Sequence, residues 1–108
     1  MKTPQISFLL GRETVRVQTD QIVRLEAMSN YTRVYFTDHP PMLMAKVLRA
    51  YDEILRPHGF VRAHRSHLIN ILYIDGIDAK GNIRMQDASC VETSRRKRRD
   101  VIQMILTA

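Results

Sequence analysis

The residues best suited to chemistry in this chain form two basic clusters. In the first, residues 62–67, two arginines and two histidines lie directly before an apolar stretch. The second, residues 95–99, consists entirely of arginine and lysine. The planar guanidinium group of arginine can bind a phosphate or a guanine edge through two parallel hydrogen bonds. Two such clusters in one small chain predict an anionic partner, above all a nucleic acid.

The positive charge of the chain is concentrated near one end. The 108 residues include 17 Lys and Arg against 11 Asp and Glu, which gives a net charge of +6. Residues 94–108 contain five cations and one acid, so they alone carry +4 of that charge. Phosphate binding depends on such local patches rather than on the average charge. A charged end that is merely solvated stays open as the alternative.

The second cluster also stands at the start of a predicted helix. Ser94 can cap a final helix from about Arg95 to Leu106. Cations in the first turn oppose the helix dipole, each at a cost of about 0.3–1 kcal/mol, and Arg95 and Arg99 repel each other at i, i+4. Local rules tend to be broken at functional sites. A phosphate would find both backbone N–H groups and arginines there, whereas a membrane-surface helix would carry its cations along one side.

The histidines of the first cluster allow two other kinds of chemistry. A zinc site needs three or four protein ligands, and no further ligand cluster accompanies His64 and His67. A nucleophilic Ser66 would need a histidine base and an orienting carboxylate, for which Asp75 and Asp78 are near only in sequence. We therefore expect no metal, no cofactor and no catalysis, with a metal-independent nuclease left as an alternative. We expect His64 mainly to orient its neighbours at a strand edge.

The elements that must position these clusters are mostly strands. Alternating and β-branched residues predict strands over residues 5–10, 14–18, 21–27, 31–37, 67–74, 83–86 and 90–93. Turns are expected at residues 11–13, 29–30, 38–41, 75–76, 80–82 and 87–89. Residues 30–33 follow one of these turns and form a third, weaker candidate for binding, because they offer an amide, two hydroxyls and a guanidinium group.

One central segment has helical periodicity. Its apolar residues recur at i, i+3, i+4 and i+7, and the helix should end at Pro57 and Gly59. We expect this helix to cover one side of a sheet. The apolar face is Met44, Val47, Leu48, Tyr51, Ile54 and Leu55, and the polar face is Lys46, Arg49, Asp52, Glu53 and Arg56.

The chain is long enough for one domain, residues 1–108, with its core over about residues 5–106. Its only cysteine, Cys90, cannot form a disulfide within the chain. No apolar run approaches the length of a membrane span and no signal peptide is evident. These features favour a cytoplasmic location without membrane contact.

Taken in series, these segments resemble the LytTR family of bacterial DNA-binding domains. The specific part is the pattern F-x-R-x-H-R-S-x-x-x-N over residues 60–70, although His67 stands where the family usually has an aromatic residue. Weaker pieces are residues 22–27, residues 30–32, the central helix and residues 94–96, in matching order over roughly residues 5–106. The resemblance implies a mainly β fold with an elongated antiparallel sheet, one covering helix and a short C-terminal helix.

The resemblance also implies a function and a set of site residues. It implies that the chain is a transcription regulator that binds double-stranded DNA with sequence specificity, through three loops that enter successive major grooves. By position, Thr32 or Arg33, then Arg65, then Arg95 would contact the duplex, and Arg65 and Arg95 suit base edges best. Phosphate contacts would come from Ser66, Arg96, Lys97 and Arg98, and Asn30 and His64 complete the set of binding residues.

Partners follow from the same resemblance. Such domains usually form the output part of a response regulator, after a receiver, a sensor or a membrane segment. Paired direct-repeat sites are typical, so two copies are expected on DNA, as a possible homodimer. The main rival function is a small β-rich protein that binds RNA or single strands. That class stacks bases on exposed aromatic side chains, whereas only 6% of residues here are aromatic.

Overall fold

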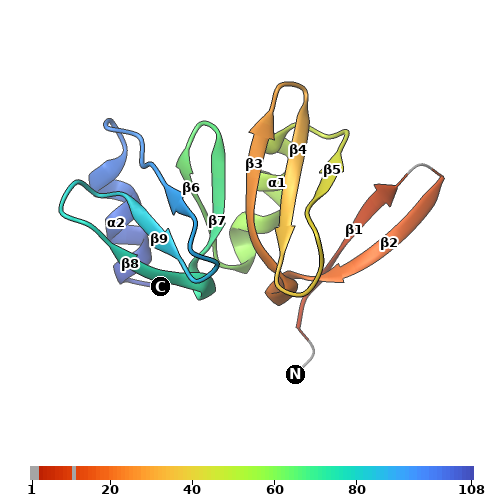
Figure 1. The fold of residues 1–108 in the computed structure, drawn as a ribbon, viewed down its shortest axis with the longest axis horizontal. Coiled ribbons are helices and arrows are strands. Elements are labelled where there is room, and N and C mark those ends of the chain that lie inside the picture. Colours follow the sequence, from red (N-terminus) through yellow and green to blue (C-terminus); the bar gives the residue numbers. More distant parts are fainter. Residues whose placement is uncertain (1–2, 11) are drawn as a thin grey trace.

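An antiparallel five-stranded sheet forms the centre of the molecule and has the strand order β5-β4-β3-β7-β6 (Figure 1). The structure, a computed structural model, describes residues 3–10 and 12–108. Within them, a β1–β2 hairpin lies at one end of an elongated molecule, and α2 with a three-stranded sheet, β10-β9-β8, lies at the other. The strands are β1 (Gln5–Leu10), β2 (Glu13–Gln18), β3 (Ile22–Met28), β4 (Tyr31–Phe36), β5 (Met42–Met44), β6 (Phe60–His64), β7 (His67–Asn70), β8 (Ile74–Ile77), β9 (Ile83–Met85) and β10 (Cys90–Val91), and the helices are α1 (Leu48–Leu55) and α2 (Arg98–Leu106).

One face of the central sheet packs against α1 and the β1–β2 hairpin. Alternation along β7 directs Leu68 toward this face, and Phe8 of the hairpin reaches the same core. The Phe8 ring lies 5.5 Å from Tyr51 of α1 and 6.3 Å from Phe36 of β4, measured between ring centroids. Aromatic contacts therefore join the hairpin to both the helix and the sheet.

The opposite face carries a second core under α2 and the small sheet. Ile69 faces this side, next to Leu68, which faces the other. Val61 and Ala63 of β6 pack there with Val101 of α2. Two opposed cores hold β6 and β7 rigid, and these two strands carry the first basic cluster. The predicted fold class, mainly β with antiparallel sheets and two helices, is confirmed.

The central helix is shorter than its periodicity predicted. Met44 lies in β5, opposite Thr32 of β4, and is buried in the first core. Its apolar side chain fits the period of a strand as well as that of the helix, so the spacing alone could not separate the two. Val47 has extended backbone and α1 begins at Leu48. Asp52, expected on the solvent side, is buried.

The C-terminal part corrects five further predictions. The final helix begins at Arg98 rather than Arg95, and residues 95–97 form a turn closed by a hydrogen bond from Lys97 N to Ser94 O. Ser94 is therefore not its cap. The predicted strand over residues 67–74 divides into β7, a 3-10 turn (Ile71–Tyr73) and β8, because the Asn70 side chain accepts from Leu72 N and bends the chain. The turn expected at residues 75–76 lies within β8, and β10 ends at Val91, before the predicted Thr93.

Candidate nucleic-acid interface

Three connections lie along one edge of the molecule (Figure 1). They are the β3–β4 turn at Ser29 and Asn30, the β6–β7 turn at Arg65 and Ser66, and the segment from β10 to α2. Antiparallel pairing of β3 with β7 brings the first two together, and Ala27 N donates to Ser66 O at 2.9 Å. Ser94 N donates to Ala63 O at 2.8 Å, which places the third connection beside β6. We call these three connections the loop edge.

The backbone of the Arg65 turn is fastened on several sides. The Arg62 guanidinium donates through Nε to His64 O at 3.1 Å and through an amino group to Arg65 O. Ser66 N donates to His64 Nδ1 at 3.1 Å. The Arg65 side chain is exposed and makes none of the hydrogen bonds or ion pairs found within residues 3–10 and 12–108. The turn thus presents a free guanidinium group from a fixed backbone.

The two histidines beside this turn have structural environments. His64 orients Ser66 through Nδ1, as expected, and it bonds the backbone N–H rather than the hydroxyl. His67 is half-buried, with an unpaired buried Nδ1, and burial lowers its pKa despite the opposing effect of nearby Glu26. In the described part of the chain, no Ser66 hydroxyl contact to a histidine is present. No group of three or more metal-ligating side chains is found there either.

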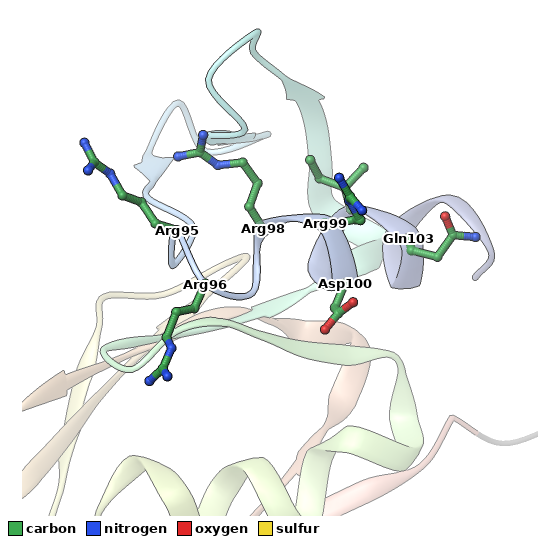
Figure 2. A pocket seen from close by; sticks show the side chains of 7 residues that line it. Arg95, Arg96, Arg98, Arg99, Asp100 and Gln103 are labelled. Carbon is green, nitrogen blue, oxygen red and sulfur yellow. The ribbon is translucent and has the colours of Figure 1, made fainter.

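The second basic cluster surrounds an open hollow of about 700 Å³ at the start of α2 (Figure 2). Figure 2 shows Arg95 and Arg98 on one side of this turn and Arg96 pointing to the other side. Arg95, Arg96 and Lys97 are exposed and stand before the helix, so the predicted repulsion of Arg95 and Arg99 along a helix does not apply. Cations on two sides of one turn can reach different parts of an anionic surface.

Arg98 differs from its neighbours because it is half-buried and also supports the fold. Its side chain lies against Gly81, which has a φ of 86° and where an added Cβ would stand 2.5 Å from the Arg98 Cδ. Its Nε donates to Thr93 Oγ1 at 3.4 Å, and Thr93 Oγ1 donates to Gly81 O at 2.8 Å. Arg98 therefore ties the β8–β9 connection to the start of α2.

A cleft of about 270 Å³ joins the two basic clusters, which are thirty residues apart in sequence. Four cations line it against a single carboxylate, so the cleft is strongly positive. Its lining residues are Asp52, Arg56, Arg62, His64, Arg65, Ser94 and Lys97. Neither the periodicity nor the spacing of the sequence indicates this meeting, which depends on the contact between the Ser94 backbone and β6.

One residue predicted to bind DNA, at the β3–β4 connection, is buried in the structure. Thr32 is fully buried and its hydroxyl donates to Lys46 O at 2.7 Å, so the prediction that Thr32 contacts DNA is wrong for this structure. Strand alternation directs Thr32 into the core and half-buried Arg33 to the other face, opposite Glu26. Asn30 is exposed in the turn, after Ser29 with its φ of 58°. Tyr31, the next residue along the chain, is also exposed.

Sequence reasoning assigned no role to Asp52 or Arg62. Asp52 Oδ2 lies 3.6 Å from an Arg62 amino group and 2.6 Å from an Arg56 amino group. A signal for its burial was present, because Asp52 is four residues after Leu48 and three before Leu55, both on the buried face of α1. An acidic residue on the buried face of a helix indicates that a cationic side chain lies close to it.

Comparisons with known proteins agree on one family. The model of the family described as LytTr DNA-binding domain matches residues 12–106. Among solved structures, the chain is similar to the LytTr DNA-binding domain of a Bacillus cereus protein, which is described as a methyl-accepting/DNA response regulator. That likeness has a TM-score of 0.74 and 20% identity and covers 100% of both chains, so it shows a shared fold. No curated protein sequence gives a significant match.

Proposed function

Because this chain belongs to the LytTr DNA-binding domain family, we propose that it binds double-stranded DNA with sequence specificity through the loop edge. The observation that carries this proposal is the free Arg65 side chain on a turn whose backbone is fastened by Arg62 and His64. An arginine that reads a guanine must hold both hydrogen bonds in one plane, which requires a fixed base. The positive cleft beside the turn supplies attraction for the backbone.

The exposed cations divide into two roles by their position. Arg65 and Arg95 project from turns at the loop edge and contact base edges in the major groove. Arg96 and Lys97, which flank the same turn as Arg95, contact phosphates, as does Ser66. Asn30 and Arg33 provide the third contact, from the β3–β4 connection, with Tyr31 beside them. Arg98 contributes positive charge but has a structural role as well.

The wider setting is that of a transcription regulator in the bacterial cytoplasm, and the domain is the output part of a response regulator. The Bacillus cereus protein with the same fold is described as a response regulator. No helix in the described ranges is long and apolar enough to cross a membrane. The start of β1 lies away from the loop edge, so a receiver domain there would leave the edge accessible (Figure 1). Two copies would occupy a direct-repeat site.

Affinity for matched nucleic acids tests this function. A duplex recovered by selection would be compared with a scrambled duplex, with each single strand and with duplex RNA of the same sequence. We expect tightest binding to the selected DNA duplex. Equal or tighter binding to a single strand or RNA would contradict the proposal and favour stacking on Tyr31. Strand cleavage in EDTA that disappears in His64→Ala would favour a nuclease instead.

A further inference from the structure

Asp52 is a buried carboxylate on α1 that makes no contact expected of a DNA-binding residue. Its side chain is 8% exposed, and in the described part of the chain Asp52 is the only charged residue that is buried. A buried carboxylate is stable only when cations and hydrogen-bond donors compensate the loss of water. Arg56 and Arg62 provide that compensation on two sides.

The two arginines differ in the groups that they contact. Arg56 is 61% exposed and binds Asp52 through two hydrogen bonds, of 3.2 and 2.6 Å, but its described polar contacts are with Asp52 alone, so it does not connect Asp52 to the loop edge. Arg62 is 23% exposed and uses its whole guanidinium fork. One amino group faces Asp52, Nε donates to His64 O, and the other amino group donates to Arg65 O.

These contacts form a continuous path from α1 to the exposed arginine of the loop edge. We propose that Asp52 is a positioning residue for DNA recognition: by holding the plane of Arg62, it fixes the backbone from which Arg65 projects. This inference rests on the proposed function of Arg65. Loss of the Asp52 charge would leave Arg62 free to turn toward solvent, and Arg65 would then start from a mobile backbone.

The consequence is a loss of discrimination rather than of general affinity. Contacts to phosphates tolerate small displacements because they depend mainly on charge. A bidentate contact to a base does not, since it requires two aligned hydrogen bonds. Weaker positioning should therefore lower affinity for the recognised duplex while leaving affinity for a scrambled duplex nearly unchanged.

Asp52→Asn tests this proposal, and the neighbouring residue provides a matched control. Glu53→Gln removes the same charge from the same helix, but Glu53 is 72% exposed and pairs only with exposed Arg49 at 3.8 Å. We expect Asp52→Asn to reduce the ratio of selected to scrambled duplex affinity by roughly fivefold or more. Glu53→Gln should keep the wild-type ratio, and Asp52→Glu, which retains the carboxylate, should restore most of it.

A measurement on the free protein separates this inference from the proposed function. The Ala27 amide donates to Ser66 O, so its hydrogen exchange reports on the turn. We expect faster exchange there in Asp52→Asn and wild-type exchange in Glu53→Gln. Should Asp52→Asn fail to fold, Arg62→Lys takes its place, because lysine keeps the charge but lacks the planar fork.

An unchanged affinity ratio together with unchanged Ala27 exchange would overturn the positioning role. So would an equal loss of affinity for both duplexes accompanied by lower stability, which indicates a structural role only. A wild-type protein without any preference between duplexes would refute the proposed function instead. The exchange experiment would then still decide whether Asp52 holds the turn.

Discussion

Replacement of Arg65 by alanine should sharply reduce sequence preference and leave the fold intact. The side chain is exposed and has no described polar partner, so its loss should change stability by no more than about 0.5 kcal/mol. The hydrogen bond from Arg62 to the turn is kept in this variant, because its acceptor is the backbone carbonyl of residue 65 and not the side chain. A bidentate arginine–guanine contact contributes about 1–3 kcal/mol of discrimination, which is roughly a 5- to 150-fold change in affinity.

Fluorescence anisotropy with the selected and scrambled duplexes, at three salt concentrations, would measure this effect. Arg16→Ala is the control, because exposed Arg16 lies in β2, on the hairpin at the other end of the molecule, and has the same charge. We expect Arg65→Ala to lose about 5- to 150-fold of the preference for the selected duplex and Arg16→Ala to keep the wild-type preference. Wild-type discrimination by Arg65→Ala would refute the argument that this turn reads bases.

Three further predictions follow from the same structure. Arg96→Ala should lower the affinity for all duplexes alike and reduce the slope of log affinity against log salt by about 0.9, as expected for one phosphate contact. Arg98→Ala should have the same effect and should also lower the free energy of unfolding, because the Arg98 side chain supports the β8–β9 connection at Gly81. Asn70→Ala should lower the free energy of unfolding by about 2–4 kcal/mol in urea titration, since the buried side chain donates to Ile22 O and accepts from Leu72 N. His67 should make the free energy of unfolding fall as pH drops below about 6.5, the ordinary pKa of histidine, because burial lowers the pKa of His67 in the folded state and the unfolded chain then binds more protons. This contribution is fully present above that pH, and His67→Phe should flatten the pH dependence below it.

Each of these has a result that contradicts it. An unchanged salt slope in Arg96→Ala would remove the proposed phosphate contact. Wild-type stability of Asn70→Ala would mean that water replaces the lost hydrogen bonds. An identical pH dependence of stability in wild type and His67→Phe would assign that dependence to other groups.

Local patterns in the sequence were sufficient for most strands but not for the ends of the helices. The alternation of Val15 and Val17 correctly indicated the first hairpin, and Ser29 and Asn30 correctly indicated a turn. Met44 satisfied both the strand and the helix period, and only its pairing with Thr32 decides between them. Ser94 had the type of a helix cap, but its backbone bond to Ala63 holds it beside β6 instead.

The sequence indicates the residue types of the candidate site but not how the structure brings them together. Arg65 is exposed on a turn, as its position before a strand indicated, and Arg95 is exposed on a turn although it was predicted to begin the last helix. Thr32 was misplaced because a one-residue difference along a strand reverses the face of the sheet. The contact of Asp52 with Arg62 and the positive cleft were not predicted, because both depend on which elements pack together, and short-range spacing does not encode that.

Selection of bound duplexes from a random DNA library at moderate salt tests the central claim most directly. Specific reading by the loop edge predicts a recovered motif, repeated in direct orientation, whose enrichment is sharply reduced in Arg65→Ala. Retention of all duplexes without enrichment would contradict the claim and would show that the basic clusters bind the DNA backbone alone.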